Sequence, residues 1–257
     1  MKIIISGAGG RMGKALREAS KEFPDIEITG FLEKEGHPLV GEKIDGVVVE
    51  SSLEKIIHKG DVIIEFTFPS PTLEHLKTCV EFGKPMVIGT TGFNESEKEE
   101  IMKAGKNIPI LFSSNMSVGM NLLFKLMREI PLILGENYEV EIVETHHRFK
   151  KDAPSGTALT LAEIIASSRG QKLEDIAVFG RKGKIEERKK EEIGIHAVRG
   201  GGIVGEHRIM FLVEGEKLEF VHEAYSRLAF ARGALRGALW LKDKPNGVYS
   251  MEDVLFR

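Results

Sequence analysis

Cysteine and long apolar runs are nearly absent from this sequence of 257 residues. Cys79 is the single cysteine, which excludes an internal disulfide and a cysteine-rich metal site and makes a reducing cytosol the expected compartment. No apolar run reaches the roughly 18 residues that a membrane span needs. The N-terminus enters a strand-like run without the pattern of a cleavable signal. We therefore expect a cytoplasmic protein with no membrane partner.

An excess of positive charge is also missing. The formal net charge is −3 at pH 7, so the chain as a whole does not attract nucleic acid or an anionic membrane. Aromatic and basic residues do not interleave as they do in nucleic-acid-binding modules. Any basic cluster is therefore local, and it suits a small anionic ligand better than a polyanion.

The sequence also lacks histidines at the spacing of a metal site, such as H-E-x-x-H. The neighbours His146 and His147 would point to opposite sides of a strand, so they are not expected to share a metal. The other histidines stand singly and are interpreted as structural residues: His37, His58, His75, His196, His207 and His222. We predict no metal site.

A glycine-rich turn follows the first predicted strand, residues 3–5. It reads Gly7-Ala8-Gly9-Gly10-Arg11-Met12-Gly13 and leads into an amphipathic helix. Strand, glycine turn and helix in this order place N–H groups opposite a pyrophosphate. Met12 replaces the third glycine of the usual G-x-G-x-x-G, so the pattern fits G-x-x-G-x-x-G better. A structural turn explains the glycines alone about as well.

The second predicted strand, residues 26–31, runs into Leu32-Glu33-Lys34. Glu33 stands twenty residues beyond Gly13, where an acid is expected to bind the adenosine ribose hydroxyls. Lys34 beside it is suited to pair with a 2′-phosphate. An acid followed by a base predicts that NADH or NADPH is accepted, whereas a plain surface carboxylate is the alternative for Glu33.

Predicted strands at 47–49, 61–66, 86–88 and 110–112 alternate with helices at 53–58, from Ser70 to Gly83, and from Asn94. This alternation predicts a Rossmann-like doubly wound parallel sheet, in which ligands bind at the carboxyl ends of the strands. Three further loops lie at those ends. Their small, hydroxylated or amide residues suit a nicotinamide riboside: Phe66, Thr67, Gly89, Thr90, Thr91, Ser113, Ser114, Asn115 and Met116.

The pattern changes beyond Asn115. We predict an open, mixed or largely antiparallel sheet with helices beside it. Its elements are a helix from Ser117, a strand at 138–143, a helix at 155–168, a polar excursion at 171–192 and strands at 193–198, 203–213 and 218–224. The excursion is expected to be mobile. A last helix at 230–241, a turn at Asn246-Gly247 and a terminal helix from Ser250 complete the prediction.

The basic segment 144–157 stands out in this second half. His146, His147, Arg148, Lys150 and Lys151 precede a helix start at Ser155-Gly156-Thr157. Cations beside the first N–H groups of a helix favour a carboxylate or phosphate, and His146 and Lys150 are both able to deliver a proton. A solvated basic loop before a capped helix is the alternative.

These motifs resemble the dihydrodipicolinate reductase family. The stretch His146-His147-Arg148 with Asp152-Ala-Pro-Ser-Gly-Thr157 is the most specific match. Other matching segments follow in order along nearly the whole chain: 7–13, 32–34, 66–67, 89–93, 115–119, 204–207 and 239–241.

The resemblance implies an NAD(P)H-dependent oxidoreductase that reduces 4-hydroxy-tetrahydrodipicolinate, a cyclic dicarboxylate, to tetrahydrodipicolinate in the diaminopimelate route to lysine. It implies that His146 is the general acid and that Lys150 assists. It assigns the substrate carboxylates to His147, Lys150, Ser155, Gly156 and Thr157. It assigns the cofactor to Gly7, Ala8, Gly9, Gly10, Arg11, Met12, Glu33, Lys34, Gly89 to Thr91 and Ser113 to Met116, with Arg227 and Phe230 beside the cleft.

The resemblance also implies a discontinuous cofactor domain, residues 1–116 plus 228–257. An α+β substrate and oligomerisation domain, residues 117–227, is inserted in it and builds a homotetramer. Phe149 departs from the family, since many members have histidine there. Lys34 in place of arginine offers a point charge and no bidentate fork, which leaves the cofactor preference open. Two rivals remain: another dehydrogenase of a small amino or oxo acid, and a non-catalytic nucleotide-sensing protein.

Overall fold

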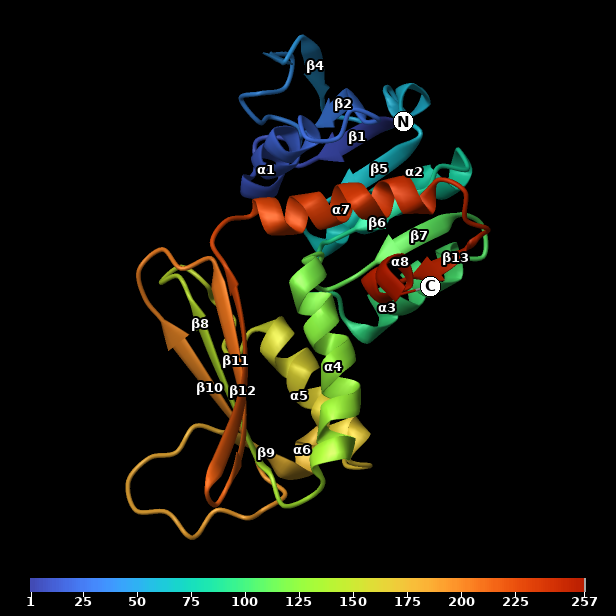
Figure 1. Ribbon diagram of the computed structural model, residues 1–257. Helices are drawn as coiled ribbons and strands as arrows, with labels where there is room; N and C mark the ends of the chain where they lie inside the picture. The colour runs from blue at the N-terminus through green and yellow to red at the C-terminus, as the bar shows by residue number, and fades with distance from the viewer. Residues whose placement is uncertain (257) are drawn as a thin grey trace. The chain divides into compact units, whose positions relative to one another are not determined.

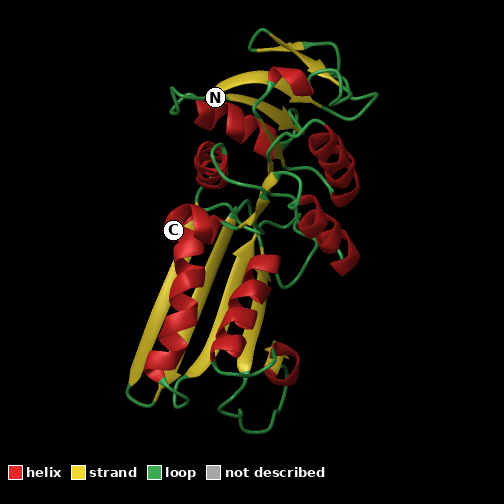
Figure 2. Cartoon of the chain, turned by 90° about the vertical axis from the view of Figure 1, so that its right-hand side faces the viewer, coloured by secondary structure: helices red, strands yellow, loops and turns green. Residues whose placement is uncertain are grey.

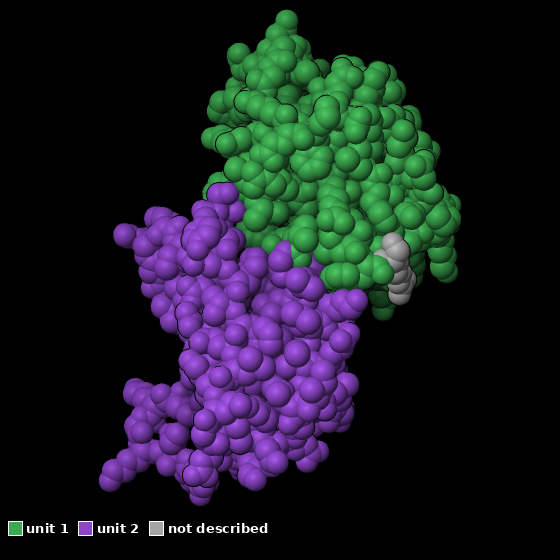
Figure 3. All heavy atoms as spheres, in the orientation of Figure 1, with its two compact units in different colours: residues 1–118, 227–257 green, residues 119–226 purple. Residues whose placement is uncertain are grey.

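The computed structural model describes residues 1–256, and the chain divides into two compact units (Figures 1 and 3). Unit 1 comprises residues 1–118 and the segment from Arg227 onward, and unit 2 comprises residues 119–226. These bounds lie within two residues of those expected from the sequence. Each unit has its own sheet and its own buried core.

Unit 1 is built on an eight-stranded sheet with the strand order β13-β7-β6-β5-β1-β2-β4-β3. Its strands are β1 (Lys2–Ser6), β2 (Glu27–Leu32), β3 (Lys43–Ile44), β4 (Val47–Glu50), β5 (Val62–Glu65), β6 (Met86–Ile88), β7 (Pro109–Phe112) and β13 (Gly247–Tyr249). The pairings are parallel except for that of β3 with β4. The chain winds from β1 toward β2 on one side and toward β5 on the other, so the predicted doubly wound sheet is confirmed.

Helices cover both faces of this sheet. They are α1 (Arg11–Ser20), α2 (Pro69–Glu81), α3 (Glu95–Ala104), α7 (Leu228–Leu241) and α8 (Met251–Phe256), with a 3₁₀ turn η1 (Ile57–Lys59). Ile3 and Ile5 of β1 pack with α1, α7 and α8, whereas Ile4 packs with α2 and α3. Alternate side chains of a strand point to opposite faces. A strand buried on both sides therefore appears in the sequence as an unbroken apolar run.

The structure corrects two local predictions in unit 1 and confirms a third. The predicted helix at 53–58 is only the 3₁₀ turn η1, because Leu53, Ile56 and Ile57 are buried by a single turn that Gly60 ends. The predicted turn at Asn246-Gly247 is also wrong, because Gly247 begins β13, whose three residues are too few for an alternating pattern. The capping box of Asn94 and Glu97 is present as predicted.

Unit 2 is built on a five-stranded mixed sheet with the order β12-β11-β8-β10-β9. Its strands are β8 (Glu139–His146), β9 (Ala177–Phe179), β10 (Ile193–Arg199), β11 (Gly205–Val213) and β12 (Glu216–Ala224). The helices α4 (Val118–Leu134), α5 (Gly156–Ser168) and α6 (Leu173–Ile176) pack on one face (Figure 2). Their apolar side chains enclose Val140, Ile142 and Phe211 of the sheet.

The expectation of a mobile excursion at 171–192 is wrong in part. The segment contains α6 and β9, and the side chains of Arg181 and Arg188 both bind the carboxylate of Glu141 on β8. Four-residue and three-residue elements carry no periodicity that a sequence pattern can reveal. Arg181 and Arg188 stand 40 and 47 positions from Glu141 in the chain, so the segment is ordered by tertiary contacts.

Candidate active site

Strand β8 carries two polar residues on the face that otherwise builds the core of unit 2. Val140 and Ile142 are buried there, and Glu144 and His146 follow on the same face because side chains alternate along a strand. The exposed fraction is 0% for Glu144 and 8% for His146. A buried charge is costly unless it is paired and hydrogen-bonded, so the partners of Glu144 define the site.

Three groups donate to the Glu144 carboxylate. Arg199 binds it with both terminal nitrogens, Nη1 to Oε2 and Nη2 to Oε1, each at 2.7 Å. The Nδ1 atom of His146 lies 2.5 Å from Oε2, and the N–H of Ser155 donates to Oε1 at 2.9 Å. Burial alone would raise the pKa of Glu144, but the hydrogen bonds from His146, Arg199 and Ser155 together lower it to about 2.

The charge of Glu144 determines which nitrogen of His146 carries its proton. An ionised carboxylate only accepts hydrogen bonds, so Nδ1 of His146 is the donor in this pair. The other ring nitrogen, Nε2, lies against Gly205, where an added Cβ would be 3.0 Å from it. The His146 ring also packs edge to face on His207, with ring centroids 5.2 Å apart. Nε2 is therefore the atom of His146 left for proton transfer.

His207 and Ser155 complete the buried cluster. His207 on β11 pairs in register with Glu144, and its Nε2 atom lies 3.1 Å from the Ser155 hydroxyl. The same hydroxyl accepts the N–H of Ala158 at 3.2 Å and caps α5. Burial first, and the neighbouring His146 second, lower the pKa of His207 to about 3, so this ring is neutral at pH 7.

Sequence reasoning missed three members of this cluster. It set His207 aside as a lone histidine and gave no role to Glu144 or Arg199. A signal for Glu144 exists, because a carboxylate two positions before a histidine on the apolar face of a strand needs a partner. Arg199 carries no such signal, since only the parallel pairing of β8 with β10 brings it beside His146.

The remaining substrate candidates lie on the segment between β8 and α5. The Nζ atom of Lys150 lies 2.9 Å from the Asp152 carboxylate, and this contact lowers the pKa of Asp152 against the opposing effect of its partial burial. Gly156 and Thr157 form the first positions of α5. His146 and the N-terminus of α5 are thus joined through Glu144 and Ser155, and the segment that carries His147 and Lys150 connects them.

In unit 1, the glycine turn is shaped by close contacts of its backbone. Gly7 has a positive φ of 76°, and its carbonyl accepts the N–H of Gly10 at 3.0 Å. A Cβ on Gly13 would lie 2.3 Å from the Gly7 oxygen, so α1 comes this close to β1 only with glycine there. The N–H of Gly9 donates to Glu33 Oε1 at 2.7 Å. Gly9 and Glu33, both predicted to contact the cofactor, therefore touch each other.

The loops after β5 and β6 are also tied together. The N–H of Thr67 donates to the Thr90 hydroxyl at 3.0 Å, and a Cβ on Gly89 would lie 2.1 Å from the Phe66 ring. Beneath them the fully buried Glu65 carboxylate binds Nδ1 of His75 at 2.7 Å. His75 was also interpreted as a lone histidine, and the structure places it under the predicted nucleotide edge.

The other residues predicted to bind the cofactor differ in how far their side chains are buried. Ala8 and Met116 are buried, so a ligand would meet their backbone. Burial lowers the pKa of Arg227, and the positive charge of Arg11 lowers it further. Lys34, Thr91 and Ser114 lie in the loops after β2, β6 and β7, and Phe230 packs against the core on α7.

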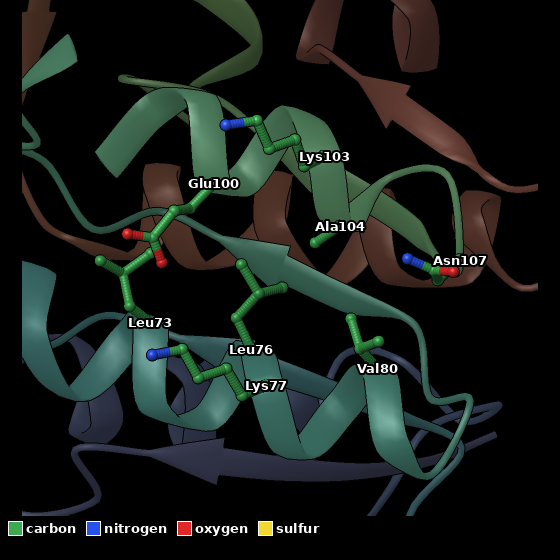
Figure 4. A pocket seen from close by; sticks show the side chains of 8 residues that line it. All are labelled: Leu73, Leu76, Lys77, Val80, Glu100, Lys103, Ala104 and Asn107. Carbon is green, nitrogen blue, oxygen red and sulfur yellow. The ribbon is translucent and has the colours of Figure 1, made fainter. Parts of the chain in front are cut away.

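A separate groove of about 280 Å³ lies between α2 and α3 (Figure 4). Its lining residues are Leu73, Leu76, Lys77, Val80, Glu100, Lys103, Ala104 and Asn107. No residue predicted for the cofactor or the substrate lines this groove. Within residues 1–256, no cluster of three or more histidine, cysteine or acidic side chains is arranged to hold a metal ion, and no helix is long and apolar enough to cross a membrane.

A doubly wound sheet with a glycine turn and an acid at the end of β2, together with a carboxylate–imidazole pair beside a helix start, defines a pyridine-nucleotide-dependent oxidoreductase. Comparison with known families makes this specific. Residues 1–116 match the family described as dihydrodipicolinate reductase, N-terminus, and residues 119–255 match dihydrodipicolinate reductase, C-terminus. The chain belongs to the dihydrodipicolinate reductase family, as the sequence motifs predicted.

Relatives and solved structures agree with this assignment. Two proteins named 4-hydroxy-tetrahydrodipicolinate reductase, from Syntrophus aciditrophicus and Pseudomonas fluorescens, are 44% and 46% identical over 99% of this chain and 98% of their own length. A dipicolinate-bound dihydrodipicolinate reductase from Paenisporosarcina sp. TG-14 matches with a TM-score of 0.78 and 25% identity, covering 99% of both chains. A meso-diaminopimelate dehydrogenase variant from Clostridium tetani, at 15% identity and a TM-score of 0.57, shares the fold.

Proposed function

We propose that this chain reduces 4-hydroxy-tetrahydrodipicolinate to tetrahydrodipicolinate with NADH or NADPH, in the diaminopimelate route to lysine. The single observation that carries the proposal is the pairing of His146 with the buried Glu144 carboxylate beside the N-terminus of α5. The pair supplies a proton, and the helix start with Lys150 supplies positive potential for an acidic ring. A nucleotide sensor without catalysis has no need of such a buried proton donor.

The residues of unit 1 fit a dinucleotide. The close approach of Gly13 to Gly7 brings the start of α1 against the turn after β1, where the first N–H groups of the helix would bind a pyrophosphate. The neighbouring cations Arg11 and Arg227 suit its charge. Glu33 accepts the Gly9 N–H through Oε1 at 2.7 Å and the Lys34 N–H through Oε2 at 3.3 Å, and each carboxylate oxygen can accept a further hydrogen bond, here from a ribose hydroxyl. Lys34, the next residue, would pair with a 2′-phosphate. The cofactor, when bound, supplies the hydride.

The substrate carries two carboxylates, and the segment 147–157 has groups for both. Gly156 and Thr157 stand in the first turn of α5, and the N–H groups of a first helical turn favour an anion. Lys150 and His147 add positive or hydrogen-bonding groups. Each charge-assisted hydrogen bond of this kind contributes roughly 1.5–3 kcal/mol. The Ser155 N–H and hydroxyl are already engaged within the protein, so its role toward the substrate is to hold the helix start in place.

The proton comes from Nε2 of His146. Loss of water from the 4-hydroxy ring gives a further double bond, and hydride addition to that double bond leaves negative charge that one proton neutralises. An imidazolium whose Nδ1–H remains bound to Glu144 is stabilised until it donates this proton. His146 then becomes neutral without changing its contact to Glu144. Lys150 assists by adding positive charge beside the ring.

We also propose a cytoplasmic homotetramer. The face of the unit 2 sheet opposite α4 and α5 carries Val143 and Met210, and Val198 and Val221 are 46% and 50% exposed there. These apolar side chains lie among charged ones of the same face, such as Glu141, Arg208 and Glu219, and a mixed surface of this kind suits another copy of the chain. Light scattering coupled to size-exclusion chromatography would give four chains per particle. Val221→Asp is expected to dissociate it, and a monomeric native protein would contradict the proposal.

A substrate assay tests the function. Purified protein is supplied with the condensation product of pyruvate and aspartate semialdehyde, and oxidation of NADH and NADPH is followed by nicotinamide absorbance. We expect turnover, and we expect His146→Ala to lower kcat by about 10²–10⁴ while cofactor affinity is unchanged. Oxidation only with other amino or oxo acids would favour a different dehydrogenase. Cofactor binding without any oxidation would favour a sensor.

A further inference from the structure

We propose that Arg199 is a positioning residue that shares the charge of Glu144, so that Glu144 orients His146 without holding its proton too firmly. This inference rests on the proposed role of His146 as the proton donor. It assigns distinct tasks to two residues that act through His146. Glu144 selects the tautomer, and Arg199 adjusts how readily the imidazolium gives up its proton.

Strand pairing and two hydrogen bonds to backbone carbonyls fix the position of Arg199. It stands in register with His146 across the β8–β10 pairing. Its Nη1 donates to the Val198 carbonyl at 2.7 Å, and its Nη2 donates to the Asp152 carbonyl at 2.6 Å. The guanidinium thus holds Glu144 and also the segment that leads into α5. A lysine at this position would keep the charge but lack the planar fork that makes both contacts to the carboxylate.

The need for charge sharing follows from the burial of Glu144. The Glu144 carboxylate is 0% exposed, so little solvent screens its attraction for a proton on the neighbouring imidazole. An imidazolium held in this way would be a poor acid. The bidentate contact from Arg199 offsets part of the carboxylate charge, so that Glu144 still accepts the Nδ1–H but attracts the proton less.

The other charged groups around His146 do not replace Arg199. His207, which packs on the ring, is neutral, and burial also lowers the pKa of His222, its register partner on β12. Lys150 is paired with Asp152. The guanidinium of Arg199 is the cation that binds the Glu144 carboxylate directly.

Removing the two partners should move the pH profile in opposite directions. In Glu144→Gln the imidazolium loses its counter-charge, so kcat/KM should begin to fall at a lower pH than in the native enzyme. In Arg199→Gln the carboxylate charge is no longer shared, so the fall should move to higher pH, with a lower maximal rate. A shift of about 1 pH unit in each case is expected for a charge within 4–6 Å. In Arg199→Lys the pH dependence of kcat/KM should shift by no more than about half of that amount, because the positive charge remains. The variant should be less stable to unfolding, because lysine cannot make the bidentate contact.

Glu141 offers a matched control on the same strand. It also binds two arginines, Arg181 and Arg188, and the Nε2 atom of His196 lies 2.7 Å from it. Three positions separate it from Glu144, which places it on the opposite face of β8. Glu141→Gln should lower thermal stability and leave the pH profile unchanged.

The experiment measures kcat/KM from pH 6 to 10 for the native protein and these four variants. Nitrogen NMR of the histidine side chains in the free protein accompanies it, with the His146 signals assigned by their loss in His146→Ala. We expect opposite shifts, and a Nδ1–H tautomer of His146 in the native protein and in Arg199→Lys but a mixture in Glu144→Gln. Shifts in one direction only, or none, would overturn the inference. So would a Nε2–H tautomer in the native protein, which NMR detects even without turnover. An inactive native protein with the Nδ1–H tautomer would instead contradict the proposed function.

Discussion

The N–H of Gly9 donates a hydrogen bond of 2.7 Å to Oε1 of Glu33, although the two residues stand 24 positions apart in the chain. The contact joins the turn after β1 to the end of β2, strands that pair in parallel. Glu33 is therefore oriented by the backbone of the turn before any ligand arrives. A ribose hydroxyl would bind a carboxylate that is already in place, which reduces the entropy lost on binding.

Glu33→Ala should weaken NADH binding by about 10- to 100-fold, because it removes one charge-assisted hydrogen bond of roughly 1.5–3 kcal/mol. Glu33→Gln keeps an oxygen for the Gly9 N–H and should lose less. A fluorescence titration of NADH gives both dissociation constants. Equal affinity in Glu33→Ala and the native protein would contradict the ribose contact.

Lys34→Ala should weaken NADPH selectively, because only NADPH carries a 2′-phosphate for the ammonium group to meet. An exposed charge pair of this kind contributes about 1 kcal/mol or less, so the ratio of NADPH to NADH affinity should fall a few-fold. The same titration with both nucleotides measures the ratio, and an unchanged ratio would remove Lys34 from the site. Lys14→Ala on α1 serves as a control for the general loss of positive charge.

Gly13→Ala should destabilise the protein by about 1–2 kcal/mol. Alanine is favoured over glycine inside a helix by about 1 kcal/mol, but the new Cβ would lie 2.3 Å from the Gly7 oxygen and 2.7 Å from the Ala8 oxygen. These are backbone atoms that cannot rotate away, so the overpacking cost of up to about 3 kcal/mol exceeds the helix gain. Chemical denaturation measures the change. Gly200→Ala, where nothing lies within 4 Å of the added Cβ, should leave stability nearly unchanged.

His207→Asn should reduce the loss of folding stability that the protein undergoes as the pH falls. The pKa of His207 falls from 6.5 to about 3 on folding, so between these values the unfolded chain binds one more proton and stability rises with pH. The lowered pKa of Glu144, about 2 against 4.5, acts in the same direction at lower pH. From pH 6 to 5 the native protein should lose about 1 kcal/mol more than His207→Asn. Denaturation at both pH values tests this, and identical losses would show that His207 is protonated in the fold.

Much of the first unit was predictable because its signals are local. A few neighbouring residues are enough to predict a strand or helix here. Examples are the apolar run from Ile3 to Ile5, the glycine turn and the Asn94–Glu97 capping box. The turn, Glu33 and the loops after β5 to β7 could be grouped from topology, since parallel strands bring their carboxyl ends to one edge. The strands β9 and β13 were not predicted and η1 was predicted as a longer helix, because three residues do not show a period.

The amino-acid sequence by itself determined the class of sheet in unit 1, the basic segment at 146–151 and the helix that starts after Ser155, because periodicity and capping are properties of neighbouring residues. Only the tertiary structure decided that Glu144 is ionised, that Nδ1 of His146 lies against its carboxylate and that His207 is neutral. Those states depend on Arg199, 55 positions from Glu144, and on burial that strands β10 and β11 create on either side of β8. Electrostatic states of buried groups are set by partners in space, and no local pattern encodes them.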